Sequence, residues 1–343
     1  MSKTALNDLG SRIIRFSPLA ASGTHDQTKG KKEEEVKNEG FINWPFTEFF
    51  FSDITTVTKN FSSEVIISED SSNVVYKGIL QDNLGFVAVK RFKNKPWPDH
   101  DDMEEEASEA GELKHKRLVK LLGYCSHEDE RLLVAEFMPN DTLAHRLFHQ
   151  KNMEWSMRLR VAYHIAEALE YCNSAGLANL RTSLRISIED GLSAYTVLFD
   201  KDDDACLSCF GLVREVIAYD KRTTGSVHTE SVTYRFGTIL VNLLTGMETP
   251  PSHVPEMING KDVTDVMDPN LKGKFSKEEA AVILNLASEC LQWTDRKSLI
   301  TEEVVATLEA LQAKNEVPSS KMPQVTKQHE EASSSSQQQQ LDH

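Results

Sequence analysis

The first third of the chain alternates hydrophobic and polar positions in short runs, a pattern typical of β-strands with one buried face. Strands are predicted over residues 64–67, 74–80, 86–92 and 131–137. One acidic stretch, residues 99–113, interrupts them and is predicted to be helical. This part of the chain should therefore form a sheet interrupted by one helix.

The rest of the folded region repeats hydrophobic residues at spacings of three and four, the period of an amphipathic helix. Helices are predicted over residues 155–172, around 283–290 and 304–311, and over the almost wholly apolar stretch 236–244. The residues that carry the period are Leu159, Ala162, Ala166, Leu169, Ile283, Leu286, Cys290, Val304, Leu308 and Leu311. A strand-rich part followed by a helix-rich part predicts an α+β chain with two lobes.

Both ends of the chain lack this periodicity. Residues 1–40 mix Ser, Thr, Lys and Glu, and residues 315–343 include runs of Ser and Gln, so neither can offset its ordering entropy by burial. We expect two disordered tails. Between them we expect a first lobe over residues 41–134, a hinge over 135–140 and a second lobe over 141–314.

Charge and cysteine content exclude some classes of function. The formal net charge of -15 is opposite to the basic surface of a nucleic-acid-binding protein, so no nucleic-acid partner is expected. Among the five cysteines, Cys206 and Cys209 form a lone C-x-x-C. We interpret them as two half-buried residues beside a strand–loop junction rather than as a metal or redox site.

Targeting signals are not evident. The sequence contains no apolar run of 18 residues and no secretory pattern, so we expect neither a membrane-spanning nor an exported chain. Ser2 follows Met1 where an N-myristoylation site requires glycine, so no myristoyl anchor is expected. These features favour a cytoplasmic location.

A lysine at the end of an apolar strand is the most specific local motif. Val87-Ala88-Val89-Lys90 resembles the strand of protein kinases whose lysine contacts the α and β phosphates of the nucleotide. Glu106 follows sixteen residues later in the acidic helical stretch, where the family places the ion-pair partner of that lysine.

Longer segments make the resemblance more specific. Residues 135–149 (A-E-F-M-P-N-D-T-L-A-H-R-L-F-H), 158–173 and 207–212 (L-S-C-F-G-L) resemble the brassinosteroid-signalling kinase (BSK) family of plant receptor-like cytoplasmic kinases, and residues 223–246 are most similar to its SHORT SUSPENSOR branch. The resemblance implies a bilobal protein-kinase fold with hinge residues Glu136 and Met138. Relatives continue into tetratricopeptide repeats, and this sequence ends before any such repeat.

The resemblance also shows where this sequence departs from a phosphate-binding loop. Counting from Val75, the three glycine positions of the loop fall at Ser68, Asp70 and Asn73. Glycines let backbone N–H groups approach phosphates closely, and all three replacements carry side chains. Asp70 also adds a negative charge where a triphosphate would lie, which should weaken its binding.

The positions of the metal ligands and of the base are also changed. Cys209 replaces the metal-binding aspartate, and a neutral thiol is a poor ligand for Mg²⁺. The second metal ligand falls at Thr196 and the catalytic base at Gly191. Arg235 lies only 26 positions after Cys209, which leaves no room for an activation segment of normal length. No metal site is expected.

Three hypotheses remain open. A pseudokinase scaffold would bind receptor kinases or components of a mitogen-activated kinase cascade, require no cofactor and bind ATP weakly. A weak atypical kinase would use Asp190, beside Gly191, as its base. A degenerate fragment would fail to fold because residues 180–190 form an insertion. Lys90 and Glu106 could bind a nucleotide or serve only as a structural ion pair.

Overall fold

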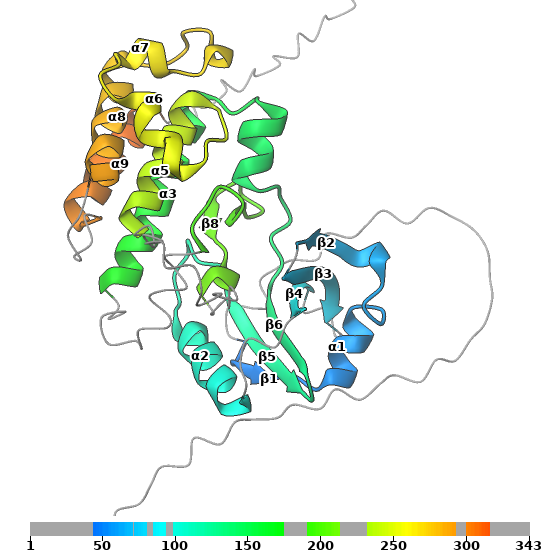
Figure 1. Ribbon diagram of the computed structural model, residues 1–343. Coiled ribbons are helices and arrows are strands. Elements are labelled where there is room, and N and C mark those ends of the chain that lie inside the picture. Colours follow the sequence, from blue (N-terminus) through cyan, green and yellow to red (C-terminus); the bar gives the residue numbers. More distant parts are fainter. Residues whose placement is uncertain are drawn as a thin grey trace, which may run out of the picture.

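The computed structural model describes residues 44–70, 72–80, 85–93, 99–174, 191–212, 232–292 and 300–315. These residues form a β-rich lobe and a mainly helical lobe, which confirms the predicted α+β architecture (Figure 1). The predicted tail 1–40, the insertion 180–190 with Asp190, and all but Asn315 of the predicted tail 315–343 lie outside the described residues.

The first lobe is built on a six-stranded sheet in the order β1-β5-β6-β4-β3-β2. Adjacent strands of this sheet are antiparallel, except that β1 runs parallel to β5. The strands are β1 (Thr47–Glu48), β2 (Ile66–Glu69), β3 (Asn73–Leu80), β4 (Gly85–Phe92), β5 (Leu121–His127) and β6 (Glu130–Glu136). Two helices belong to this lobe, α1 (Phe51–Val57) and α2 (His100–Glu112).

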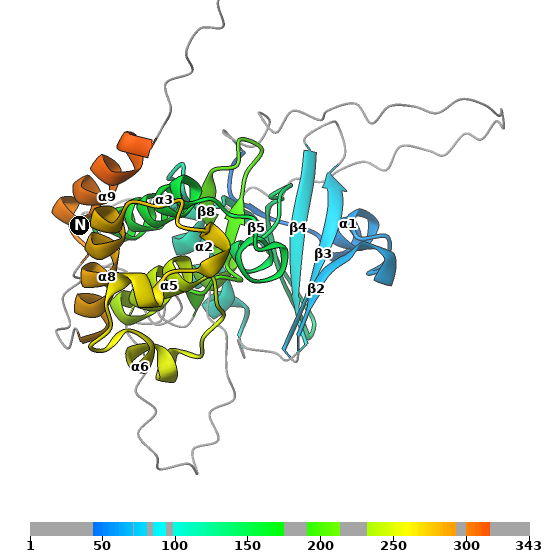
Figure 2. The ribbon, with the colours of Figure 1, turned by 90° about the horizontal axis from the view of Figure 1, so that it is seen from above.

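The strands divide their side chains between two hydrophobic clusters because successive residues face opposite sides of a sheet. On β6, Leu132 and Val134 pack in one cluster with Ile54 of α1. Leu133 and Ala135 pack in the other, which includes α2 and extends into the helical lobe. Figure 2 shows α1 on the side of the sheet away from the helical lobe.

The segment before β2 is a feature that the hydrophobic pattern did not predict. β1 and α1 cover the sheet, and β1 lies so close to β5 that a Cβ at Gly123 would clash with the carbonyl oxygen of Thr47. The predicted strand 64–67 is half wrong: residues Ser63–Val65 form a 3₁₀ turn, and β2 begins at Ile66. The Ser62 hydroxyl accepts a hydrogen bond from the Glu64 N–H and so favours the turn.

The second lobe packs its helices around α3 and α5. Its regular elements are the π-helical turn His145–Gln150, α3 (Trp155–Ser174), β7 (Val197–Phe199), β8 (Ala205–Leu207), α5 (Val232–Thr245), α6 (Val254–Ile258), α7 (Val263–Val266), α8 (Lys277–Gln292) and α9 (Glu302–Asn315). α5 packs on α8 and α3 packs on α9, so the four predicted helical regions are present. No described helix is both long and apolar enough to cross a bilayer.

The segment between α2 and β5 holds the two lobes together. The Val119 N–H donates to the Leu207 carbonyl at 2.9 Å, and the Leu207 N–H donates to the Arg117 carbonyl at 2.8 Å. The His115 ring stacks on Tyr171 of α3 with ring centroids 4.7 Å apart. The C-terminal end of α2 is therefore attached to the helical lobe through backbone and side-chain contacts.

A buried ion pair joins three parts of the helical lobe. Arg158 of α3 is 1% exposed, and its guanidinium donates to Asp268, to the Leu243 carbonyl of α5 and to the Met153 carbonyl. Asp268, 3% exposed, also accepts the backbone N–H and side-chain amide of Asn270. Both charges are therefore compensated inside the protein.

We expect Arg158→Met to lower the free energy of unfolding by about 3–5 kcal/mol, because it leaves the Asp268 carboxylate buried without its cation. The matched control is Lys116→Met, which removes an ion pair to Glu167 whose lysine side chain is 60% exposed and should cost less than about 1 kcal/mol. Urea denaturation of the two variants measures the difference. Equal losses would contradict the structural role assigned to Arg158.

Candidate functional site: the cleft between the lobes

Lys90 lies on β4, on the face of the sheet that is turned toward α2. It pairs with Val75 of β3 and is only 5% exposed, and its Nζ lies 5.0 Å from the centroid of the Phe92 ring. The positive charge of Lys90 acts to lower the pKa values of two other residues, Asp70 and Cys209. The lysine, the β2–β3 turn and the Cys209 segment therefore lie near one another.

Glu106 lies on the buried stripe of α2. Met103, Ala107 and Ala110 share that stripe, and Glu106 is 8% exposed. Glu106 is thus a buried carboxylate on an otherwise apolar helix face, and Lys90 is a buried cation of the same lobe; buried charges are rarely left uncompensated. Sequence reasoning therefore selected two residues that are both buried.

The β2–β3 turn contains the three predicted loop positions. Ser68 lies in β2, Asn73 begins β3, and Asp70 lies between the strands. One carboxylate oxygen of Asp70 accepts the backbone N–H of Ser72 at 2.6 Å and that of Asn73 at 2.8 Å. Burial is the largest single influence and raises the pKa of Asp70, but these hydrogen bonds, the Asn73 side chain and the Lys90 charge together outweigh it, so the pKa is lowered overall. Asp70 is therefore held as a carboxylate.

Cys209 begins the 3₁₀ turn Cys209–Leu212 directly after β8 and is 1% exposed. Burial raises the pKa of its thiol far above the ordinary value, so the group stays protonated. Burial likewise raises the pKa of Cys206 to about 12. Both cysteines are fully buried rather than half-buried as predicted, and the described residues contain no cluster of three or more His, Cys, Asp and Glu side chains that could hold a metal.

The turn 191–196 contains the other two predicted positions. The Thr196 hydroxyl donates to the Gly191 carbonyl at 2.6 Å and accepts the Ser193 N–H at 2.9 Å. Its oxygen is therefore used to close the turn. Gly191 has no side chain that could accept a proton. The donor set Cys209 and Thr196 does not fit Mg²⁺, which prefers several anionic or carbonyl oxygens.

The hinge residues connect the sheet to the helical lobe. The Glu136 N–H donates to the Lys120 carbonyl at 3.0 Å, and burial raises the pKa of the Glu136 carboxyl. Met138 is partly buried and packs against the larger hydrophobic cluster. Lys77 lies over the ring of Phe137 at 4.5 Å from its centroid, which fixes the start of the hinge against β3.

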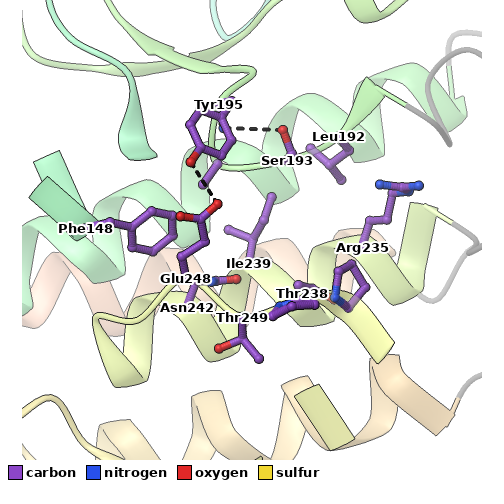
Figure 3. Close-up of a pocket in the computed structure, with 13 residues that line it drawn as sticks. Phe148, Leu192, Ser193, Tyr195, Arg235, Thr238, Ile239, Asn242, Glu248 and Thr249 are labelled. Carbon is purple, nitrogen blue, oxygen red and sulfur yellow. Dashed lines mark hydrogen bonds between the residues drawn. The ribbon is translucent and has the colours of Figure 1, made fainter. Parts of the chain in front are cut away.

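A separate cavity of about 460 Å³ lies in the helical lobe (Figure 3). It is lined by the turn 192–195, by Phe148, by α5 residues that include Ile239 and Arg235, and by the loop after α5. Across its mouth the Tyr195 hydroxyl donates to Glu248 at 2.8 Å. The turn that contains Gly191 and Thr196 therefore also forms one wall of this cavity.

A cluster of charges lies behind the cleft, where α3 meets β8. Arg117 bonds Glu167 at 3.2 Å and Asp204 at 2.6 Å, and Asp204 lies 3.9 Å from Nε2 of His164. Nδ1 of His164 accepts the Ala205 N–H. Burial, with the nearby Arg117 charge, lowers the pKa of His164 to about 4, so its ring is neutral at pH 7.

Sequence reasoning did not predict that the Asp70 side chain accepts backbone N–H groups of its own turn. The composition Asp-Ser-Ser-Asn is a turn signal, since aspartate side chains accept N–H groups two residues ahead. It also missed the cluster around Arg117 and the cavity beside Tyr195. Both depend on residues far apart in the sequence, and no local pattern marks them.

Residues 64–308 match the model of the protein tyrosine and serine/threonine kinase family. The match covers more than half of the chain, so the chain belongs to the protein tyrosine and serine/threonine kinase family. The predicted bilobal kinase fold is therefore confirmed.

Three relatives make the comparison more specific. The chain is 55% identical over 304 residues to "Probable inactive receptor-like kinase BSK12" of Arabidopsis thaliana, covering 88% of the chain and 63% of the relative. It is 49% identical to Arabidopsis "Serine/threonine-protein kinase BSK1" and 43% identical to "Serine/threonine-protein kinase BSK1-2" of Oryza sativa subsp. japonica; each match covers 83% of this chain and 57% of the relative. The resemblance to the BSK family is confirmed, and the chain spans about three fifths of the length of these relatives.

Lys90→Met and Glu106→Gln should each lower the free energy of unfolding by about 3–5 kcal/mol if the two residues form a structural ion pair. The double variant should lose clearly less than the sum, because it leaves no uncompensated buried charge. Urea denaturation of all four proteins measures the coupling. Additive losses would show that Lys90 and Glu106 do not stabilise each other.

The stability of the protein should fall as the pH is lowered from about 6.5 to 4. The unfolded chain protonates His164 near pH 6.5 and the folded chain only near pH 4, so in this window the unfolded state binds more protons. His164→Asn, whose Oδ1 can accept the Ala205 N–H, should reduce this dependence. Burial also lowers the pKa of His115, so a smaller slope should remain.

Urea denaturation at several pH values tests this prediction. His253→Asn changes an exposed histidine and is the control, because it should leave the pH dependence unaltered. A slope that is the same in wild type and His164→Asn would exclude His164 as its source.

Proposed function

We propose that this chain is a catalytically inactive, kinase-like scaffold or regulator in plant receptor-kinase signalling. The observation that carries the proposal is Cys209. Where the kinase resemblance calls for a metal-binding aspartate, the chain has a buried thiol whose pKa is raised by burial. Such a thiol is neutral and turned into the core, so it offers no oxygen ligand to Mg²⁺.

Loss of the metal ligands matters because phosphoryl transfer depends on positioning and on neutralisation of the phosphate charge. The hydroxyl of Thr196 is used within its own turn, and Gly191 has no proton acceptor. Each missing group is typically worth roughly 10² or more in rate. Together the three changes argue against phosphate transfer by the described residues.

Lys90 and Glu106 remain as the vestige of a nucleotide pocket. The protein requires no cofactor under this proposal, and any ATP binding is weak and independent of magnesium. Its partners are proteins: receptor kinases, or components of brassinosteroid or mitogen-activated kinase signalling. The name of the first relative, which contains "inactive receptor-like kinase", supports this direction. We propose a cytoplasmic location, with recruitment to the plasma membrane through partners.

A weak atypical serine/threonine kinase is the second candidate. It is favoured by the other two relatives, whose names describe serine/threonine-protein kinases. In that case Asp190, next to Gly191, would act as the base, and Lys90 would hold the phosphates. This candidate needs a carboxylate at position 190 and a cation at position 90.

Purified protein incubated with labelled ATP and Mg²⁺ should incorporate no phosphate, and Mg²⁺–ATP should not raise its melting temperature. Cooperative unfolding in the same melting curve checks that the chain is folded. The control is the protein with Lys90→Met, which should also incorporate no phosphate and show no rise in melting temperature with Mg²⁺–ATP, although its melting temperature without ligand is lower than that of wild type. Incorporation that is lost in both Asp190→Asn and Lys90→Met would reject the scaffold proposal and favour the weak kinase.

A further inference from the structure

Three described backbone N–H groups of the β2–β3 turn, those of Asp70, Ser72 and Asn73, are hydrogen-bonded within the turn. A single oxygen of Asp70 accepts the N–H groups of Ser72 and Asn73, and the Asp70 N–H donates to the Asn73 carbonyl at 3.0 Å. Two successive N–H groups that converge on one anionic oxygen form the kind of concavity in which proteins bind phosphate. Here the anion in the concavity is part of the chain.

Lys93 closes the turn from the other side. Its N–H donates to the Ser72 carbonyl at 2.8 Å, and its ammonium bonds the Asp70 carbonyl at 2.6 Å and the Glu69 carboxylate at 2.8 Å. Lys93 directly follows β4, so the turn is fastened to the strand that carries Lys90. A side chain that could otherwise neutralise a phosphate is engaged with the turn itself.

The charge of the turn also opposes an incoming phosphate. Asp70 places a carboxylate on the two donors, and the neighbouring Glu69 carboxylate, which is paired with Lys93, lies beside it; Lys90 acts on the Asp70 carboxylate. A polyphosphate would have to displace the Asp70 oxygen from its two donors and would meet like charge as it did so. The occupied donors and the repulsion between like charges therefore both act at Asp70.

We propose that Asp70 is a built-in substitute for phosphate: its carboxylate occupies the anion-binding donors of the β2–β3 turn and so excludes nucleotide phosphates from the cleft. This inference rests on the proposed function, in which the cleft does not bind Mg²⁺–ATP. It adds that weak nucleotide binding results from one occupied set of donors as well as from missing metal ligands.

Asp70→Ala vacates both N–H donors, and Asp70→Asn removes the charge while its amide oxygen can still accept them. The probes are inorganic tripolyphosphate and ATP, both without metal, measured by isothermal titration calorimetry. We expect no saturable binding to wild type. Asp70→Ala should bind both probes at least about tenfold more tightly, since charge-assisted hydrogen bonds become available. Asp70→Asn should show a smaller gain.

Glu69→Gln is the matched control, because it removes a neighbouring carboxylate of the same charge and leaves the Ser72 and Asn73 donors occupied. It should gain less affinity than Asp70→Asn. The gain in Asp70→Ala should disappear when Lys90→Met is added and the double variant still unfolds cooperatively, which places the new binding in the cleft. Equal gains in Asp70→Asn and Asp70→Ala would mean that charge alone matters, and would overturn the role of the donors.

Absence of binding to a cooperatively folded Asp70→Ala protein would overturn the inference and leave the proposed function intact. Phosphate incorporation by wild type with Mg²⁺ would instead reject the proposed function. If Asp70→Ala does not fold, Asp70→Gly decides, because it also vacates both donors and glycine is tolerated in a turn. Tripolyphosphate binding by that variant supports the inference, and its absence overturns it.

Discussion

The buried ion pair between Arg158 and Asp268 is the constraint on which the helical lobe depends. The guanidinium reaches a carboxylate and two backbone carbonyls, so α3, α5 and the segment after α7 must keep their relative positions. Removal of two charges from water costs several kcal/mol for each, and only this complete set of partners compensates for it. Glycine at position 246 is required for two reasons: its φ is positive, and a Cβ there would collide with the Asp268 carboxylate.

The same physical rule explains which charges this kinase-like chain has kept and which it lacks. A buried carboxylate at position 209 would require a cation or metal beside it, and a cysteine fills the space without that requirement. Thr196 satisfies its hydroxyl within its own turn. Charges that have a protein partner, such as Arg117 with Glu167, remain. Thr196 and Asp70 of the cleft therefore use their side-chain oxygens in hydrogen bonds within the protein.

Much of the fold was predictable from local pattern, because the strands β3, β4 and β6 and the long helices bury one side at a regular period. β1 and α1 were not, since these short segments approach the sheet closely at two glycines, β1 at Gly123 and the end of α1 at Gly78. The 3₁₀ turn before β2 was mistaken for strand because a single cap at Ser62 overrides the apolar residues that follow. The positions Lys90, Glu106 and Cys209 were found from the kinase resemblance. The burial of these residues and the hydrogen bonds of Asp70 depend on the three-dimensional structure and could not be predicted from the sequence.

Under the proposed function, in which the chain transfers no phosphate, the protein acts through its surfaces. Selection on such a protein would preserve the contacts between the lobes, such as Val119 with Leu207 and His115 with Tyr171, because these contacts fix the position of one lobe relative to the other. It would not preserve a mobile phosphate loop. In the β2–β3 turn, Asp70 and Lys93 hold backbone groups through hydrogen bonds. Groups that are already held in this way lose less conformational entropy when a protein partner binds than flexible groups do.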